Sequence, residues 1–392
     1  NNKRIEDTDC SLCGQCITHC PVGALVERDD TEKVFEALAD PDIITVVQIA
    51  PAVRAAWGEE LGLSREEATV GKIVDALRKI GFDYVFDTTF AADLTIMEEG
   101  TELIHRIRKG EKPPMFTSCC PGWVRFIKSQ YPDMVSKLST AKSPQQMFGA
   151  ITKTYFAEKM KIDPRKIYCI SIMPCTAKKY EKDIPGINGA DEGVDVDAVL
   201  TTRELVKMIR AEHINPRDLK DENMDDILGD GTGAGVIFGA TGGVMEAALR
   251  SAYYLLTGEN PKADSFKKVR GMNGWKEAEF DIGSTTLKVA IASGLGNARK
   301  LMDAIERNEV QYDFVEIMAC PGGCSGGGGQ PIFHNKEFAK DRAEVLYGLD
   351  ESSERRFSHE NPMIMKCYDE YLGEPLSRTA HEILHFSHNK HR

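Results

Sequence analysis

Residues 316–331 read Glu-Ile-Met-Ala-Cys-Pro-Gly-Gly-Cys-Ser-Gly-Gly-Gly-Gly-Gln-Pro. This stretch places Cys320 and Cys324 among six glycines. Because glycine lets the backbone approach a bulky group closely and adopt positive φ, the pattern favours a chain folded tightly onto a metal–sulfur cluster. A flexible glycine-rich loop with incidental cysteines would fit the same residues. A phosphate-binding loop would need Gly-Lys-Ser/Thr, whereas Gln330 and Pro331 follow here.

Size and charge limit the classes of protein that the chain can represent. Its 392 residues can bury a large core and suggest roughly two or three domains. A net charge of −12 argues against sequence-independent binding of nucleic acid, which needs clustered positive charge. The apolar runs, such as residues 43–53 and 167–173, are too short to span a bilayer. We therefore expect no membrane span and no nucleic-acid partner.

The chain has eleven cysteines, which are clustered along the sequence. Runs of the C-x-x-C type without an export signal favour iron–sulfur or metal ligation over disulfides. We therefore expect a reducing compartment and a cytoplasmic protein. Two cysteines, Cys169 and Cys367, stand alone in the sequence and are expected to be structural.

Residues 10–21 read Cys-Ser-Leu-Cys-Gly-Gln-Cys-Ile-Thr-His-Cys-Pro, the C-x₂-C-x₂-C-x₃-C-P run of bacterial ferredoxins. In two-cluster ferredoxins the first three cysteines hold one cluster and the fourth holds its neighbour. Cys10, Cys13 and Cys16 would then lack a fourth ligand, and Cys20 would lack three companions. Either an upstream half is absent or all four adapt to one cluster, so we expect one or two [4Fe–4S] clusters here.

From about residue 40 the sequence alternates short apolar runs with helical stretches, which predicts a mostly parallel α/β sheet. We expect helices over residues 70–80 and 92–109, surface loops over 177–197 and 214–231, and helical or irregular segments over 340–392. In such sheets ligands gather outside the carboxyl ends of strands. Cysteines follow the apolar residues 115–116, 172–173 and 317–318, so the separate motifs should converge on one site. The expected strands are residues 43–50, 84–90, 115–116, 167–173, 235–239, 287–293 and 314–319.

Three segments together resemble the signature motifs of [FeFe]-hydrogenases. They are Thr-Ser-Cys-Cys-Pro-Gly-Trp at residues 117–123, Met-Pro-Cys-Thr-Ala-Lys-Lys-Tyr-Glu at 173–181, and Met-Ala-Cys-Pro-Gly-Gly-Cys at 318–324. The resemblance covers nearly the whole chain. It implies a two-lobed α/β fold of mostly parallel sheets with flanking helices around a buried iron–sulfur site. It divides the chain into a ferredoxin-like segment (1–30), a catalytic domain (31–340) and a wrapping segment that resembles the hydrogenase small subunit (341–392).

The resemblance also implies a cofactor, the H-cluster. A [4Fe–4S] cube would be bridged through Cys324 to a two-iron unit that carries CO, cyanide and a dithiolate. Since the chain does not make those small ligands, hydrogenase maturation proteins are implied. Lys178 would anchor a cyanide, and Ala52 stands where close relatives often have serine, which predicts altered tuning of the site. The cube ligands would be Cys120, Cys175, Cys320 and Cys324, and the lining of the pocket would include Pro51, Ala52, Met173, Met318, Gln145 and Phe238.

A proton route is implied as well. Cys119, next to a ligand, would pass protons to the two-iron unit, although such a thiol can also simply pack in a core. Glu99 and Glu102 lie three residues apart on one helix face and would continue the route, with Ser139 between them and Arg106 near the surface. Taken alone, these glutamates would suggest a solvated helix face.

The implied function is an iron-only hydrogenase that reversibly reduces protons to H₂ with electrons from ferredoxin or a similar carrier. A hydrogenase-like iron–sulfur assembly protein and an H₂ sensor with slow turnover are the alternatives. Cys119 and Lys178 argue against the assembly protein, and the sequence contains no recognisable signalling domain to suggest a sensor. The run His-Glu-Ile-Leu-His at 381–385 fits a zinc-protease motif. The longer form of this motif needs a glycine where His388 stands and a Met-turn after it, so we do not expect a protease.

Overall fold

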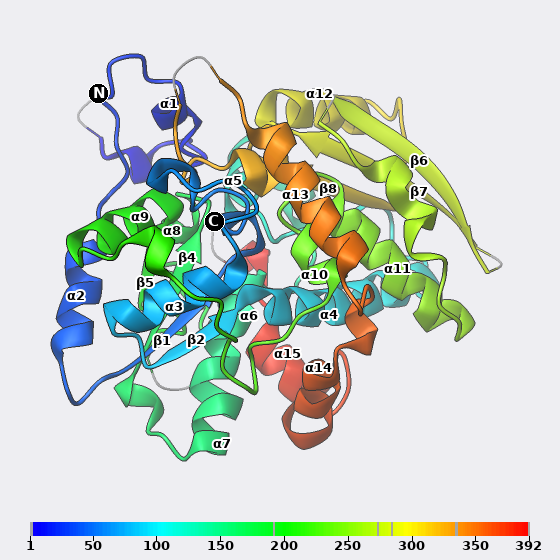
Figure 1. Ribbon diagram of the computed structural model, residues 1–392. Helices are drawn as coiled ribbons and strands as arrows, with labels where there is room; N and C mark the ends of the chain where they lie inside the picture. Colours follow the sequence, from blue (N-terminus) through cyan, green and yellow to red (C-terminus); the bar gives the residue numbers. More distant parts are fainter. Residues whose placement is uncertain (1–2, 191–192, 273, 284, 334–335, 391–392) are drawn as a thin grey trace.

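The computed structural model describes residues 3–190, 193–272, 274–283, 285–333 and 336–390. Its strands form two four-stranded sheets, one in each lobe (Figure 1). The first sheet is wholly parallel and has the order β2 (Tyr84–Asp87), β1 (Ile44–Ile49), β4 (Ile167–Met173), β5 (Ala198–Thr201). The second has the order β3 (Met115–Phe116), β8 (Phe314–Met318), β7 (Thr285–Ser293), β6 (Trp275–Ile282).

In the second sheet only the β6–β7 pair is antiparallel among the described strands. The expected two-lobed, mostly parallel α/β fold is therefore confirmed. The central strands β1 and β4 are rich in Ile and Val and almost wholly buried, because helices cover both faces of a parallel sheet. α11 (Gly243–Thr257) and α12 (Leu295–Glu306) both pack on the second sheet, and they lie on opposite faces of it in Figure 1.

The long helix α4 (Thr88–Arg108) joins the two lobes. It contacts α6 (Pro144–Ile151) on one side and α10 (Gly233–Ile237) and α11 on the other. Residues 88–100 of α4 are buried without interruption, so the acidic side chains of this stretch lie inside the protein. α4 begins earlier than expected, and the strand before it ends at residue 87, because the Asp87 carboxylate accepts a hydrogen bond from the Thr89 amide at 2.8 Å and caps the helix.

The expected strand at residues 235–239 is wrong, because α10 occupies this place. The Thr232 hydroxyl accepts a hydrogen bond from the Gly235 amide and caps the start of this helix. An apolar run this short is compatible with either a strand or a helix, because it has no clear periodicity. β5 and β6 were not expected. β6 is half exposed and carries charged side chains on its exposed face, so its sequence lacks the apolar run by which other strands were predicted.

The segment 177–197, expected to be a surface loop, is only partly so. It contains the short helix α8 (Lys178–Glu181), in which two lysines are buried. Lys179 can be buried because its ammonium pairs with Asp30 and Glu204, at 2.8 and 2.9 Å. These partners lie far away in the sequence, so no local pattern announces them.

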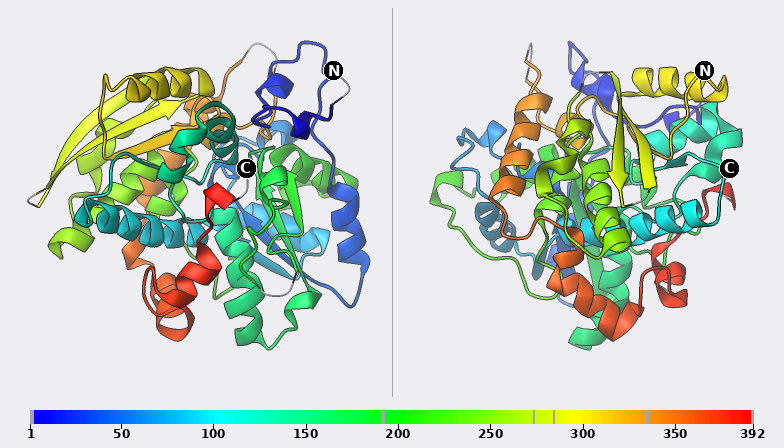
Figure 2. Two further views of the ribbon diagram at one scale, coloured as in Figure 1. Left: turned by 180° about the vertical axis from the view of Figure 1, so that it is seen from behind. Right: turned by 90° about the vertical axis from the view of Figure 1, so that its right-hand side faces the viewer.

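The C-terminal segment is helical and runs across the core. α13 (Ala339–Ser352) packs on α10, α14 (Pro362–Cys367) on α4, and α15 (Arg378–Leu384) on α6. Figure 2 shows this segment, coloured orange to red, from two further sides. Two further helices, α3 (Val70–Ile80) and α9 (Thr202–Ala211), belong to the first lobe, and α3 has the bounds expected from the sequence. Among the described residues, every helix is too short or too polar to cross a bilayer.

Candidate active site

Cysteines from both lobes meet where parallel strands end. Cys120 follows β3 and precedes α5 (Pro121–Gln130), Cys175 follows β4, and Cys320 and Cys324 follow β8. Burial raises the pKa of the Cys175 thiol, and the nearby thiols of Cys120 and Cys324 raise it further. Burial also raises the pKa of the Cys320 thiol, and the thiols of Cys175, Cys120, Cys13 and Cys324 raise it further. The four sulfurs, all free thiols, therefore face a common centre, at the carboxyl edges where the sequence predicted a site.

Glycines let the loop after β8 close on this centre. Gly322 and Gly323 have φ of 80° and 74°, in the left-handed region that favours glycine. The Gly329 amide donates to the Pro174 carbonyl at 2.8 Å, which fastens the loop to the Cys175 turn of the other lobe. A Cβ atom on Gly327 would collide with that same carbonyl. The expected close folding of the glycine-rich stretch is therefore present.

A cavity of about 70 Å³ lies beside the cysteines. Cys120, Cys175 and Cys324 are partly exposed to it, whereas Cys320 is buried. The walls are mostly apolar, and the residues that the resemblance placed around the pocket all line it: Pro51, Ala52, Gln145, Met173, Lys178, Phe238 and Met318.

The donor set fits an iron–sulfur cube. Four neighbouring thiols offer the soft ligands that iron–sulfur chemistry prefers. In the described part of the chain, no group of three or more His, Cys, Asp or Glu is close enough to share a single metal ion. A cube of four irons spreads its ligands over its corners and needs no such closeness. The apolar cavity next to the thiols leaves room for a second group.

Lys178 brings a positive charge to this cavity. Its ammonium donates to Glu181 at 2.8 Å and to the Cys119 carbonyl at 3.2 Å. Burial lowers the pKa of Lys178, but the Glu181 carboxylate and the nearby sulfurs of Cys175 and Cys119 together raise it above its usual value, so the side chain stays charged. Glu181 also accepts from Ser143 and Gln145. Sequence reasoning missed Glu181, although its spacing of three from Lys178 was a usable signal.

The carboxylates of α4 lead from Cys119 toward the surface. Glu99 is fully buried, and neither of its oxygens has a hydrogen-bond partner within the described residues. Burial, together with the charge of Glu102, raises the pKa of Glu99 to about 8. Burial also raises the pKa of the Cys119 thiol, and the adjacent Glu99 raises it further. Cys119 and Glu99 are therefore neighbours that both hold protons at neutral pH.

Glu102 completes this row of polar groups. Its carboxylate accepts from the Ser139 hydroxyl at 2.7 Å and from the Arg106 guanidinium at 2.6 Å. The Ser139 hydroxyl also lies near the Glu99 carboxyl. The structure thus brings Arg106, Glu102, Ser139, Glu99 and Cys119 together in the order expected from the sequence. We name these five residues the relay row.

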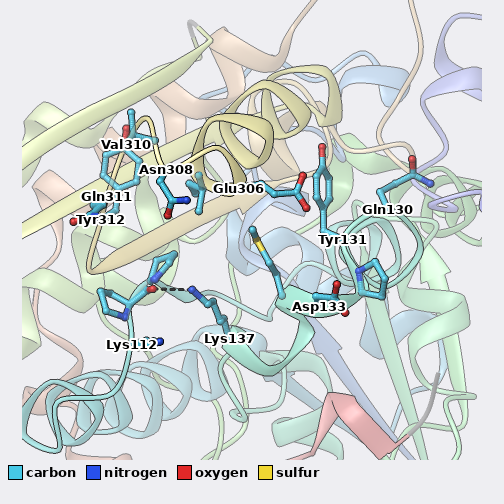
Figure 3. Close-up of a pocket in the computed structure, with 15 residues that line it drawn as sticks. Lys112, Gln130, Tyr131, Asp133, Lys137, Glu306, Asn308, Val310, Gln311 and Tyr312 are labelled. Carbon is cyan, nitrogen blue, oxygen red and sulfur yellow. Dashed lines mark hydrogen bonds between the residues drawn. The ribbon is translucent and has the colours of Figure 1, made fainter.

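A wider groove of about 560 Å³ lies near the outer end of the relay row (Figure 3). Lys137 belongs to both places: its carbonyl accepts from Arg106, and its ammonium donates to the Pro113 carbonyl at 2.8 Å. Lys112 also lines this groove. Burial lowers the pKa of Lys137, and the positive charge of Lys112 lowers it further. The groove contains no cysteine.

The N-terminal segment lies against the four-cysteine site. Burial raises the pKa of the Cys13 thiol, and the neighbouring thiols of Cys10 and Cys16 raise it further. The Cys320 thiol donates a weak hydrogen bond to the Cys13 carbonyl, at 3.8 Å from sulfur to oxygen. Cys20 has different surroundings: the Ala24 amide donates to its sulfur at 3.3 Å.

Side chains of the core hold this segment in place. Gln15 donates to the Gly326 carbonyl at 2.8 Å, and Thr176, next to Cys175, donates to the Leu12 carbonyl at 2.7 Å. Arg125 of α5 donates to the Cys10 carbonyl at 2.8 Å. The outer cysteines therefore have a fixed position relative to the inner ones.

The zinc-protease pattern at 381–385 has a structural use. α15 ends at Leu384, so the two histidines do not share one regular helix. Both ring nitrogens of His385 are engaged, Nε2 with Glu98 at 2.9 Å and Nδ1 with Thr140 at 2.8 Å. Glu382 pairs with Arg378 on the surface.

Comparisons with known proteins agree with this site. Residues 43–328 match the family described as "Iron only hydrogenase large subunit, C-terminal domain". Residues 336–391 match "Iron hydrogenase small subunit", and residues 4–26 match "4Fe-4S binding domain". A solved structure of apo [FeFe]-hydrogenase HydA1 from Chlamydomonas reinhardtii superposes with a TM-score of 0.82 at 44% identity, over 92% of this chain and 98% of that one.

Curated relatives point the same way. The chain is 52% identical to the NADP-reducing hydrogenase subunit HndD of Solidesulfovibrio fructosivorans over 97% of its length, and spans 66% of that relative. It is 46% identical to the periplasmic [Fe] hydrogenase large subunit of Nitratidesulfovibrio vulgaris, over 86% of this chain and 88% of the relative. The cytosolic iron-sulfur assembly component 3 of Bos taurus is more distant, at 30% identity over 98% of this chain and 84% of the relative. The fold, the cysteine centre and these matches together show that the chain belongs to the iron-only hydrogenase family.

Proposed function

We propose that the chain is the catalytic part of an iron-only hydrogenase that reversibly reduces protons to H₂ with electrons from ferredoxin or a similar carrier. The relay row carries this proposal, because it ends at a partly buried thiol, Cys119, on the wall of the cavity. A scaffold that only binds iron–sulfur clusters has no use for a row of proton-holding groups. A hydrogenase needs one, since its protons must reach a centre that is closed to water.

In this proposal Cys120, Cys175, Cys320 and Cys324 would hold the cube, and Cys324 would also hold the two-iron unit. Lys178 holds an anionic ligand of that unit through its charged ammonium. When bound, the H-cluster supplies the redox chemistry and the binding of H₂. The apolar walls, including Met173, Met318 and Phe238, exclude water from the reaction.

The residues of the relay row then move protons to and from Cys119 Sγ. The thiol gives its proton toward the cavity and regains one from Glu99, which holds a proton up to a pH of about 8. Ser139 can accept a proton on one lone pair while it donates its own, so it can connect Glu99 with Glu102. Arg106 keeps Glu102 in place at the outer end of the row. General acid–base steps of this kind contribute about 10²–10⁴-fold to a rate.

Electrons would arrive through the N-terminal segment. Cys10, Cys13 and Cys16 would hold one [4Fe–4S] cluster, and Cys20, with its separate surroundings, would serve a second one. The contact between Cys320 and the Cys13 carbonyl supports this route, because it brings a proposed ligand of the cube close to a proposed ligand of the outer cluster. We retain the division into segments 1–30, 31–340 and 341–392, a cytoplasmic location, and dependence on maturation proteins as parts of this proposal.

The test is to mature the protein anaerobically and measure H₂ evolution together with the infrared bands of CO and cyanide. We expect both bands and rapid turnover. The assembly-protein reading predicts no bands after maturation, and the sensor reading predicts bands with slow turnover. A Cys169→Ala variant is a matched control, because Cys169 is buried in β4 away from the cavity and should keep both signals.

A further inference from the structure

The three glutamates of α4 in this region do not face the same way. Glu98 is rotated by about 100° from Glu99 around the helix axis, and it is also fully buried. Its carboxylate accepts from the Tyr368 hydroxyl, from the Leu376 amide at 2.9 Å and from His385 Nε2 at 2.9 Å. These donors all belong to the C-terminal segment. Glu98 is therefore the point at which that segment is fixed to the relay helix.

His385 connects this anchor to the relay row. While Nε2 faces Glu98, Nδ1 lies 2.8 Å from the Thr140 hydroxyl. The Thr140 amide donates to both oxygens of Glu102, at 3.0 and 3.2 Å. The buried imidazole of His385 thus links Glu98 to Thr140, and the backbone of Thr140 binds Glu102. Both glutamates belong to α4.

The peptide that carries Ser139 and Thr140 lies between two partners. On one side, the Ser139 amide donates to the Phe116 carbonyl of β3 at 2.7 Å. On the other, the Phe386 amide donates to the Thr140 carbonyl at 2.7 Å, and the Lys142 amide donates to the Leu384 carbonyl at 2.8 Å. Residues 384–386 therefore pair with one edge of the strand-like segment 139–142 through backbone hydrogen bonds.

We propose that His385 is a positioning residue of the proton relay: by bridging Glu98 and Thr140, it holds segment 139–142 so that Ser139 and Thr140 meet the Glu102 carboxylate. The proposal rests on the proposed function and extends it to the C-terminal segment. With Nε2–H donated to Glu98, Nδ1 accepts from the Thr140 hydroxyl, and the rigid ring fixes the distance between the two. A misplacement of about 1 Å in a catalytic arrangement can cost about 10²-fold in rate.

Two substitutions separate positioning from simple anchoring. In His385→Gln the side-chain amide reaches the position of Nε2, so the bond to Glu98 is kept and the bond to Thr140 is lost. In His385→Asn the amide takes the position of Nδ1, so the bond to Thr140 is kept and the anchor is lost. If His385 only ties down the C-terminal segment, the asparagine variant should be the more damaged in every respect.

The experiment compares the matured wild type, both His385 variants and a control, His359→Gln. His359 lies in the same C-terminal segment and bridges Ser251 and Asn260 with its two ring nitrogens, away from the relay row. Two quantities are measured on each protein: H₂ evolution as a function of pH, and hydrogen–deuterium exchange of the amides of residues 138–142.

We expect His385→Gln to lose about tenfold or more in turnover and to exchange the Thr140 amide faster. His385→Asn should melt at a lower temperature but keep most of its turnover per folded molecule, and His359→Gln should keep both readouts. Wild-type turnover and exchange in His385→Gln, or a larger turnover loss in His385→Asn, would overturn the proposal. If the wild type itself makes no H₂, the proposed function fails, while the exchange data still decide whether His385 holds segment 139–142.

Discussion

The two groups of cysteines in this molecule occupy opposite environments. In the N-terminal segment Cys10 and Cys16 are exposed to solvent. The inner four lie between the lobes, where Cys320 is buried and the other three are partly exposed beside a mostly apolar cavity. A thiolate cluster near the surface can exchange electrons with a partner, whereas one in a dry interior lets fixed charges such as Lys178 act strongly on bound groups. We infer that the outer group only relays electrons and that the inner group does the chemistry.

The largest effect should come from an inner ligand. Cys175→Ala should abolish H₂ evolution and the infrared bands of CO and cyanide, because the cube would lose one of its four proposed ligands. The signal of the outer cluster in electron paramagnetic resonance should remain. The matched control is Cys169→Ala, in the strand that precedes Cys175. Substantial activity of Cys175→Ala would show that the inner cysteines are not the reacting centre.

The next effect concerns the thiol beside the ligands. Cys119→Ser should cut turnover by about 10²–10⁴-fold, since a hydroxyl gives up its proton far less readily than a thiol. Iron content and infrared bands should be unchanged, because Cys120, and not Cys119, is the proposed ligand. Near-normal turnover would remove the relay row from the mechanism, and loss of the cube would mean that the two adjacent cysteines have exchanged roles.

A third prediction uses pH. The folded protein keeps the Glu99 proton up to a pH of about 8, whereas the unfolded chain loses it near 4.5. Between these values the native state binds more protons, so the free energy of unfolding should fall as pH rises and then level off. Glu99→Gln should flatten this part of the curve, measured by denaturant unfolding at several pH values. An unchanged slope in the variant would show that Glu99 is ionised in the native protein.

The smallest effect is expected at Ala52. This residue is fully buried on the cavity wall beside Pro51. Ala52→Ser adds a hydroxyl that can donate one hydrogen bond into the cavity, worth about 1 kcal/mol, so turnover should change by less than about tenfold. The cyanide bands should shift, while the outer cluster's redox potential should not. A shift of that potential would mean that the two cysteine groups are not electronically separate.

The parts of this account that follow from sequence share one property: they are local. The buried strands before Cys175 and Cys320, and the helix spacing of Glu99 and Glu102, can be read from short windows. What could not be read depends on distant partners. Lys179 looked like a surface lysine because Asp30 and Glu204 were not visible beside it, and Glu98 and His385 show their connection only once α4 and the C-terminal segment have packed together.

The central claim, that chemistry belongs to the inner group alone, can be tested through isotope exchange between D₂ and water. This exchange needs the inner site and its proton route but no electrons from outside. Cys13→Ala should therefore lose most of its H₂ evolution with an external electron donor while it exchanges D₂ at the wild-type rate, with both infrared bands intact. If D₂ exchange falls in parallel with donor-driven H₂ evolution, the outer cysteines are part of the reacting centre and the division of labour is wrong.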